Sequence, residues 1–160
     1  MTGELQRLDA GHAGALLRFE RDNREFFARS VPDRGDDYFA GFAARHAELL
    51  AEQATGRCHF HVLVDADGEV LGRFNLVDVV NGVAELGFRV AERVTGQGVA
   101  SDGVRRVCGL ARADYGLRRL VALTAVGNAA SMGVLRRTGF VAVDPVNMDG
   151  EPGLRHVLDL

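Results

Sequence analysis

The segment Glu85–Ala111 constrains the fold more than any other part of the chain, because its hydrophobic period changes at a glycine-rich turn. Up to Val90, apolar residues alternate with polar or small ones, which predicts a half-buried strand. Apolar residues then recur at helical spacing, which predicts a helix over Val99–Tyr115. We therefore expect a strand, a turn that contains Gly96 and Gly98, and a helix.

A turn of this kind is suited to binding an anion. The first N–H groups of the helix have no partner within the helix, and the helix dipole adds partial positive charge at the same place. Gly96 and Gly98 would let a phosphate approach the backbone, and Arg93 would add charge. A Walker A loop is excluded because no Lys follows Gly98, and a dinucleotide fingerprint would need a third glycine where Ser101 stands. A pyrophosphate cradle for an acyl-carrier cofactor and a turn without a ligand both remain open.

Two ordered motifs resemble those of a known family. The motif Arg93-x-x-Gly96-x-Gly98-x-Ala100 is similar to the motif with which the GNAT superfamily of N-acetyltransferases binds the pyrophosphate of acetyl-CoA. The motif Asn128-x-x-Ser131-x-x-Val134-Leu135-x-x-x-Gly139-Phe140 resembles the family's second signature. The segment Glu20–Phe26 with Pro32, and the final strand around Arg155–Leu158, resemble the RimJ/RimL branch, so the resemblance extends over nearly the whole chain.

This resemblance implies an α+β fold of the GNAT type, in which helices flank a mixed, mostly antiparallel twisted sheet, as one domain over residues 1–160. It implies that the strands Ala84–Val90 and Leu117–Thr124 splay apart to admit acetyl-CoA. The implied activity is acetyl-CoA-dependent N-acetylation, with a protein N-terminal α-amine as the preferred acceptor and a homodimer as a possible state. A small-molecule amine, such as a polyamine or an antibiotic, and a noncatalytic CoA-binding module are the alternatives.

The resemblance also implies which residues contact the cofactor. The backbone near Phe88–Val90 is expected to hold the thioester carbonyl, and the turn before the helix is expected to hold the pyrophosphate. Asn128 would cap its own helix as well as contact the cofactor. The full set is Phe88, Arg89, Val90, Arg93, Val94, Thr95, Gly96, Gln97, Gly98, Val99, Ala100, Ser101, Asn128 and Ser131.

Two residues are candidates for catalysis. Glu85, on the strand that leads to the turn, is the preferred general base, although a carboxylate at this place could also be a solvated strand residue. Ser131 is placed by the motif near the pantetheine or the thiol, or it is structural. The chain departs from the family at Leu135, where many members have the Tyr that protonates the thiolate, and Tyr115 is expected on a different helix. Weaker polar candidates are His59, His61 and Asn75.

The other elements follow from periodicity and turn residues. Asp67-Gly68 and Asn81-Gly82 predict two hairpins, and the strand-helix-strand crossover predicts one parallel pair. The expected strands are Glu4–Leu8, Arg57–Val64, Glu69–Val79, Val83–Val90, Leu117–Thr124 and a region from Gly139 to Leu160. The expected helices begin at Ala13, at Tyr38 after a break at 30–37, at Val99 and at Asn128.

Composition limits the partners. A formal charge of −3 gives no basic field for nucleic acid, and no run of about 20 apolar residues is present that would span a membrane. Cys58 and Cys108 are not at metal-ligand spacing and read as reduced, packed thiols, so no metal and a cytoplasmic location are expected. His46 is expected to be a packed or a surface histidine rather than a catalytic one. The segment Asn23–Phe42 is expected to recognise the amine acceptor.

Overall fold

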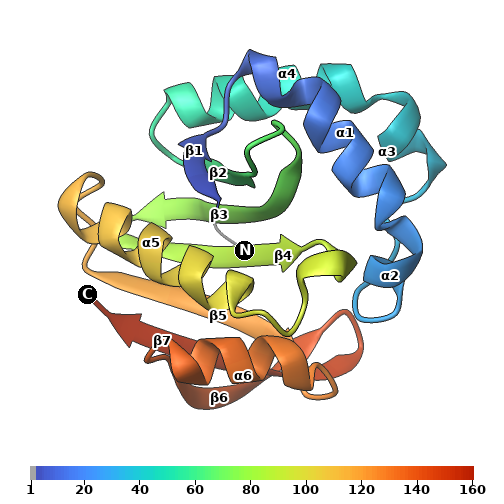
Figure 1. The fold of residues 1–160 in the computed structure, drawn as a ribbon. Coiled ribbons are helices and arrows are strands. Elements are labelled where there is room, and N and C mark those ends of the chain that lie inside the picture. Colours follow the sequence, from blue (N-terminus) through green and yellow to red (C-terminus); the bar gives the residue numbers. More distant parts are fainter. Residues whose placement is uncertain (1–2) are drawn as a thin grey trace.

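The computed structural model describes residues 3–160 and places seven strands in one mixed sheet, in the order β1-β2-β3-β4-β5-β7-β6 (Figure 1). The strands are β1 Glu4–Arg7, β2 His59–Val64, β3 Val70–Val80, β4 Val83–Val90, β5 Arg119–Ala125, β6 Val141–Met148 and β7 Glu151–Asp159. The helices are α1 Ala13–Asp22, α2 Arg24–Ala28, α3 Asp36–Ala40, α4 Phe42–Ala54, α5 Val99–Ala113 and α6 Ala129–Arg137. Short 3₁₀ turns lie at Ala10–His12 and Glu92–Val94.

The expected pairing of the first strands is confirmed. β1, β2, β3 and β4 follow one another as antiparallel neighbours, and the two predicted hairpins join β2 to β3 and β3 to β4. β4 and β5 form the predicted parallel pair, with α5 as the crossover. The sheet is therefore mixed and mostly antiparallel, as expected.

Two regions differ in detail from the sequence-based expectation. The helix expected to begin at Tyr38 is divided at Gly41 into α3 and α4. The C-terminal region forms a hairpin rather than one strand, and its second strand, β7, lies between β5 and β6. The hairpin turn is Asp149-Gly150, a dipeptide that favours such turns.

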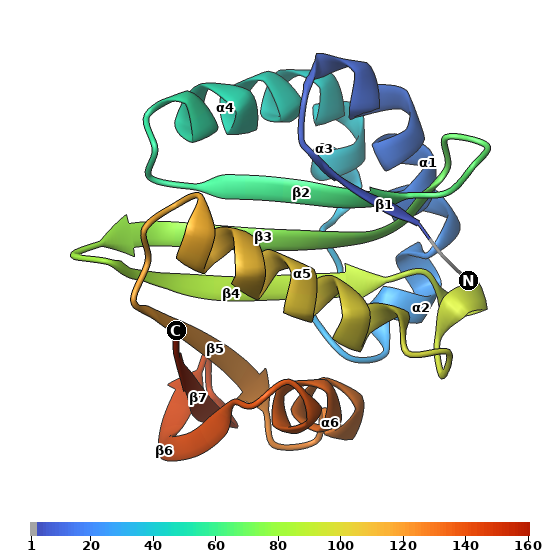
Figure 2. The ribbon, with the colours of Figure 1, turned by 60° about the vertical axis from the view of Figure 1, so that its left-hand side comes forward.

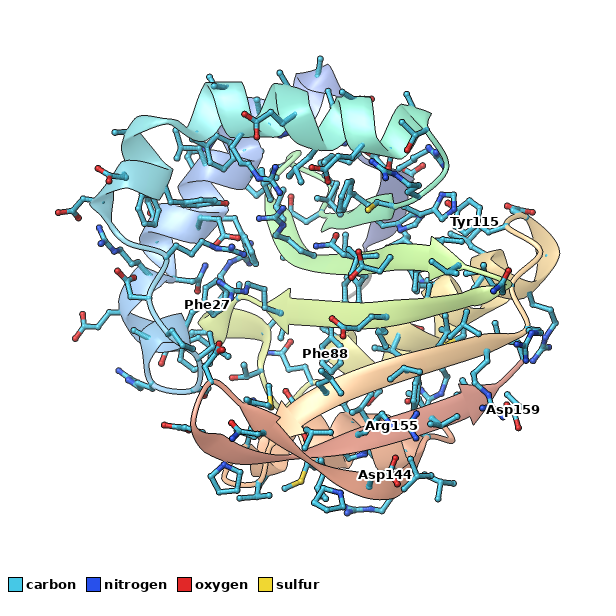
Figure 3. The ribbon with its side chains drawn as sticks, turned by 180° about the vertical axis from the view of Figure 1, so that it is seen from behind. Phe27, Phe88, Tyr115, Asp144, Arg155 and Asp159 are labelled. Carbon is cyan, nitrogen blue, oxygen red and sulfur yellow. The ribbon has the colours of Figure 1, made fainter. Side chains whose placement is uncertain are left out.

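Helices cover the two faces of the sheet unequally. α5 and α6 lie on one face, and α1 to α4 cover the other face over the β2–β3 end (Figures 1 and 2). Seen from behind, β4, β5 and β7 have no helix in front of them (Figure 3). This uncovered half of the sheet is a surface that a second reactant could approach.

The packing of α5 against the sheet depends on Gly103. A Cβ atom at this position would lie 2.2 Å from Cζ of the fully buried Phe74 on β3, so only glycine allows the helix to lie this close. Val104 and Val107 of the same helix are also fully buried. The contact fixes the position of α5, and therefore of its N-terminus, relative to β3 and β4.

His46, Cys58 and Cys108, which were not expected to act in catalysis or metal binding, have structural roles. His46 is buried, and its Nε2 lies 2.9 Å from the carbonyl oxygen of Asp9. Cys58 is buried, and burial raises the pKa of the Cys108 thiol to about 11, which keeps it protonated and unreactive. None of the helices within residues 3–160 is long and apolar enough to cross a membrane.

Candidate active site

The sheet opens between β4 and β5. Their parallel pairing covers only Val83–Glu85 and Arg119–Val121. Beyond this point β4 continues to pair with β3 up to Val90, while β5 continues to pair with β7 up to Ala125. The two strands therefore follow different neighbours and diverge, which confirms the splay that the family resemblance implied.

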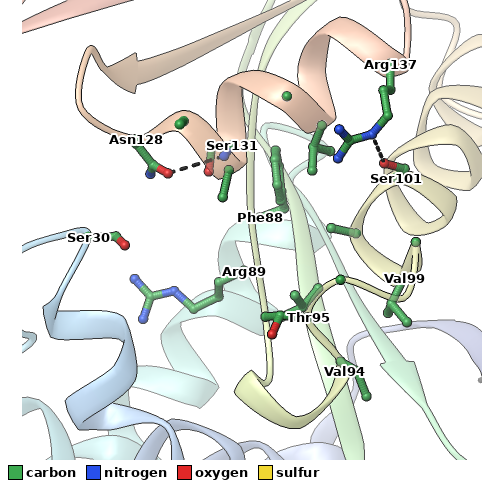
Figure 4. Close-up of a pocket in the computed structure, with 18 of the residues that line it drawn as sticks. Ser30, Phe88, Arg89, Val94, Thr95, Val99, Ser101, Asn128, Ser131 and Arg137 are labelled. Carbon is green, nitrogen blue, oxygen red and sulfur yellow. Dashed lines mark hydrogen bonds between the residues drawn. The ribbon is translucent and has the colours of Figure 1, made fainter.

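A cavity of about 670 Å³ lies at this opening, within the range typical of small-molecule sites. Its wall is formed by four segments: α2 with the loop after it, the C-terminal half of β4, the turn that leads into α5, and α6 (Figure 4). These segments come from the two halves of the chain, so the cavity exists only in the folded protein.

The N-terminus of α5 forms one end of the cavity. Gly96 and Gly98 have φ values of +74° and +78°, and a Cβ at either position would meet nothing within 4 Å. Gly98 is the N-cap, and its lack of a side chain leaves the N–H groups of the first helical turn accessible. The backbone of Val99, Ala100 and Ser101 thus faces an open space with partial positive charge, which suits a pyrophosphate.

α6 forms the opposite wall. The Asn128 side-chain oxygen accepts a hydrogen bond from the Ser131 N–H at 3.2 Å, so Asn128 caps the helix while both residues line the cavity (Figure 4). Nε of Arg137 donates to Oγ of Ser101 at 3.4 Å and joins α6 to α5. Arg136 and Arg137 both line the cavity and add positive charge to it.

All but two of the residues expected to contact the cofactor line this cavity. The exceptions are Arg93 and Gln97. Nη2 of Arg93 lies 3.4 Å from a carboxylate oxygen of Asp65 in the β2–β3 turn, and the Gln97 amide donates to the Arg93 carbonyl at 3.2 Å. Their side chains stabilise the turn from outside. The residues that do line the cavity are Phe88, Arg89, Val90, Val94, Thr95, Gly96, Gly98, Val99, Ala100, Ser101, Asn128 and Ser131.

Glu85 is not among the residues that line the cavity; on β4 the lining begins at Phe88, three residues further along the strand. Glu85 occupies the last paired position of β4 and β5, opposite Val121, with Val77 of β3 on its other side. Because side chains alternate along a strand, Glu85 lies on the same face as Arg89. Burial, and then the nearby Asp78 carboxylate, raise the pKa of Glu85, which makes its carboxylate a stronger base than an exposed one.

Asn75 is the polar neighbour of Glu85 on that face. It pairs with Gly87, two residues further along β4 than Glu85, which pairs with Val77. The side-chain oxygen of Asn75 is buried and has no hydrogen-bond partner within the described residues. Such a group is costly to bury, so Asn75 is suited to accept a hydrogen bond from a bound reactant.

The other polar candidates lie elsewhere. His61 pairs with Phe74, on the face covered by α5, and its Nε2 lies 2.6 Å from the Tyr115 hydroxyl oxygen. The ring of His59 stacks on Tyr115 with centroids 3.7 Å apart. Tyr115 follows the C-terminal end of α5, about 20 Å along the helix from the cavity. Burial lowers the pKa of His61 to about 4, so His61 is a neutral, packed residue.

Leu135 stands where many members of the family have a Tyr, so this position has no polar group. Its side chain is fully buried in the core, while Val134 beside it lines the cavity. Of the side chains on α6, Ser131 therefore has the hydroxyl group within the cavity wall. A thiolate that leaves in this cavity would have Ser131 or water available as a proton source.

Sequence reasoning did not assign the α2 wall to the cofactor cavity. Phe26 and Phe27 of α2, with Ser30 and Val31 after it, line the cavity opposite α6. From the sequence, these residues belong to the segment Asn23–Phe42, which was expected to recognise the acceptor. The two adjacent Phe residues before a Pro-containing break were the available signal, but which wall they meet depends on tertiary packing.

Comparisons with known proteins agree with this geometry. Residues 4–141 match the model of the acetyltransferase (GNAT) domain. The chain is 27% identical over 139 residues to the probable N-acetyltransferase YjcK of Bacillus subtilis, covering 83% of this chain and 77% of YjcK.

Solved structures show the same fold at low sequence identity. The ribosomal-protein-S5-alanine acetyltransferase of Vibrio fischeri matches with a TM-score of 0.89 at 18% identity. The match covers 97% of this chain and 91% of the Vibrio fischeri chain. RimJ of Mycobacterium smegmatis, solved in complex with CoA-disulfide, matches with a TM-score of 0.86 at 22% identity. The match covers 97% of this chain and 80% of the RimJ chain.

The family match covers most of the chain, so the protein belongs to the GNAT acetyltransferase family. It is an N-acetyltransferase, and acetyl-CoA is the acetyl donor that this family uses. The open cradle at Gly96 and Gly98 and the cavity beside β4 fit that donor.

Proposed function

We propose that this protein transfers the acetyl group of acetyl-CoA to the N-terminal α-amine of a protein or peptide, by direct attack of the amine on the thioester. The observation that carries the proposal is the cavity where β4 and β5 diverge, which begins at the open N-terminus of α5 and is lined on β4 by Phe88–Val90, three residues beyond Glu85. A noncatalytic CoA-binding role would not need a carboxylate with a raised pKa at the point where the strands part.

The donor is held mainly by the protein backbone. The turn from Arg93 to Val99 and the first turn of α5 would hold the pyrophosphate, with Arg93 and Gln97 supporting the turn. The edge of β4 at Phe88–Val90, which has diverged from β5, would place N–H groups beside the pantetheine and the thioester oxygen. Asn128 and Ser131 would contact the donor from α6.

The transfer can be written as a balanced reaction. The acceptor ammonium first gives one proton to Glu85, directly or through one water. The amine nitrogen then attacks the carbonyl carbon, the N–C bond forms, and the C–S bond breaks. The nitrogen gives its second proton to water, and the leaving sulfur takes one proton from water or from Ser131, which water then reprotonates. Glu85 releases its proton to solvent after the transfer. The products are an N-acetyl amine and CoA with a free thiol.

Positioning supplies much of the expected rate. Holding the amine and the thioester in an attacking geometry contributes up to about 7–11 kcal/mol in favourable cases. Proton transfer to Glu85 adds a smaller factor, of about 10²–10⁴. Asn75 would accept a hydrogen bond from the amine, since its buried oxygen lies on the same face as Glu85.

The uncovered half of the sheet supports a peptide as the acceptor. The strands β4, β5 and β7 have no helix in front of them in Figure 3, and Gly87 of β4 is exposed, so an extended chain could approach the end of the splay. The likeness to a ribosomal-protein-S5-alanine acetyltransferase, an enzyme that is named for a protein acceptor, supports the same class.

An amine screen tests the proposal. The purified protein would be incubated with acetyl-CoA and, in turn, peptides with N-terminal Ser or Ala, polyamines and aminoglycosides, while the appearance of CoA thiol is followed. We expect thiol release with the peptides and a product that gains one acetyl group. Release with polyamines or aminoglycosides alone would overturn the peptide assignment. Binding of acetyl-CoA without release for any amine would favour the noncatalytic role.

A further inference from the structure

A buried carboxylate near the cavity binds three arginines. Glu20 of α1 is 1% exposed. Its carboxylate accepts hydrogen bonds from Arg73 on β3 at 2.8 Å, from Arg89 on β4 at 3.2 Å and from Arg34 in the loop after α2 at 3.2 Å. These four residues, which we call the Glu20 cluster, join three parts of the fold.

The Glu20 cluster carries more positive than negative charge. One carboxylate faces three guanidinium groups, and the nearby Asp33 and Asp36 are bonded to a different arginine, Arg24. Burying unbalanced charge is unfavourable unless a counter-charge is supplied. Burial, followed by repulsion from Arg34, lowers the pKa of Arg89, which is consistent with an excess of cations.

Two of the three arginines of the Glu20 cluster are partly exposed, and one of them lines the main cavity. The side chains of Arg34 and Arg89 are 33% and 22% exposed, whereas that of Arg73 is 6% exposed. Arg89 lines the main cavity, and in Figure 4 its guanidinium points toward Ser30 across the cavity. Arg34 and Arg89 also line a small cleft that adjoins this cavity.

The position of Arg89 relative to Glu85 sets the distance at which an anion would lie. Both are on the same strand and the same face, four residues apart, which corresponds to about 13 Å along β4. An amine held beside Gly87 would lie about 7 Å along the strand from Arg89. A carboxylate one residue away from that amine in an extended peptide could reach the arginine, because each residue spans about 3.5 Å and the side chain adds further reach.

From this geometry we propose that the acceptor carries an acidic side chain next to its amine, and that Arg34 and Arg89 recognise this side chain. The proposal rests on the peptide acceptor proposed above and specifies it as an N-terminus whose second residue is Asp or Glu. The acceptor carboxylate supplies the counter-charge that the Glu20 cluster lacks. Arginine is suited to this role because its planar guanidinium pairs with a carboxylate through two hydrogen bonds.

The test uses three peptides that differ only at the second residue, Ser-Glu, Ser-Gln and Ser-Lys. For the unmodified protein we expect kcat/KM for Ser-Glu to exceed that for Ser-Gln by on the order of tenfold, the effect of one charge-assisted hydrogen bond. Ser-Lys should be poorer than Ser-Gln. The preference should decrease as the salt concentration rises, since the pairing groups are partly exposed.

Variants at Arg34 locate the preference. Arg34 does not line the donor cavity, so R34Q should lower the Ser-Glu to Ser-Gln ratio toward one, R34K should retain part of it, and R34E should favour Ser-Lys. R18Q is the matched control, because Arg18 pairs with Glu69 on the surface away from the cavity, and it should leave the ratio unchanged. Thermal unfolding of each variant checks that it is folded.

The outcomes separate the two proposals. Acetylation of all three peptides at equal kcat/KM would overturn the acidic preference and leave the peptide acceptor standing. A Ser-Glu preference that R34Q and R34E do not alter would also overturn the role of the Glu20 cluster. Acetylation of polyamines or aminoglycosides with no peptide product would overturn the proposed function itself.

Discussion

Glu85 and Val121 form the last cross-strand pair between β4 and β5 before the two strands part. This position puts a carboxylate of raised pKa at the closed end of the splay, on the sheet face that is open to solvent around β4, β5 and β7. The donor cavity lies beyond it, toward the N-terminus of α5. The two reactants would therefore meet beside Glu85.

The first prediction concerns the pyrophosphate cradle. Replacing Gly98 with Val should weaken acetyl-CoA binding by at least tenfold in calorimetry, because the side chain would fill the space in which the phosphate approaches the backbone. Gly56 is a matched control, since it also has a positive φ, of +80°, with nothing near its Cβ position, but lies after α4. Gly56→Val should carry a similar backbone strain and bind acetyl-CoA normally. Equal affinity in the two variants would refute the placement of the pyrophosphate.

The second prediction concerns the general base. Glu85→Gln keeps the size of the side chain and should lower kcat by about 10²–10⁴ while acetyl-CoA binding is retained. Raising the pH should partly restore the rate, since the acceptor amine then loses its proton in solution. If KM for the amine rises and kcat is unchanged, Glu85 binds the acceptor and does not act as the base. The surface variant Glu69→Gln is the control.

The Asp78 carboxylate gives an independent check on that role. Asp78 contributes to the raised pKa of Glu85, so Asp78→Asn should lower that pKa. A base with a lower pKa becomes ionised at lower pH. The ascending limb of the profile of kcat against pH should therefore move to lower pH in Asp78→Asn. An unshifted limb would mean that another group gives rise to it.

Turn chemistry and periodicity were sufficient to predict most of the fold. The Asp-Gly and Asn-Gly dipeptides located the first two hairpins, and the glycine-rich turn located α5 and the parallel crossover. The insertion of β7 between β5 and β6 could not be predicted, because strand order depends on contacts between residues far apart in sequence. The division at Gly41 has the same origin, since a single glycine is often tolerated within a helix.

The site was predictable where it depends on the backbone and less so where it depends on side-chain direction. The cradle at Gly96 and Gly98 followed from local chemistry. Arg93 belongs to the motif, yet its side chain turns outward to Asp65, a contact that sequence spacing does not show. The three arginines around Glu20 come from the loop after α2 and from two strands, so no local pattern could reveal their convergence.

The third prediction concerns the leaving thiol. Ser131→Ala should lower kcat by less than Glu85→Gln does, because water can also protonate the thiolate in an open cavity. The Asn128 cap should persist, since its bond is to the Ser131 backbone N–H and not to the hydroxyl. The measurement compares acetyl-CoA with an acetyl thioester whose thiol is more acidic. The variant's deficit should shrink with the better leaving group, and a constant deficit would assign Ser131 a structural role.

The fourth prediction concerns the pH dependence of stability. The pKa of His61 is lowered from 6.5 in the unfolded chain to about 4 in the fold, so the unfolded chain takes up the proton first as the pH falls. Stability should therefore decline between pH 6.5 and 4, by about 3 kcal/mol from this residue. Urea unfolding of His61→Asn should show a shallower decline than the unmodified protein. Identical slopes would show that His61 does not cause it.

The most direct test of acetyl transfer to an α-amine is to locate the acetyl group on the product. A Ser-Glu peptide that also contains a Lys would be treated with acetyl-CoA and the protein, and the product mapped by tandem mass spectrometry while CoA thiol is counted. We predict one acetyl group on the α-amine for each thiol released, and none on a copy of the peptide with a blocked N-terminus. Acetylation of the Lys side chain, or thiol release that is the same with and without peptide, would contradict the account.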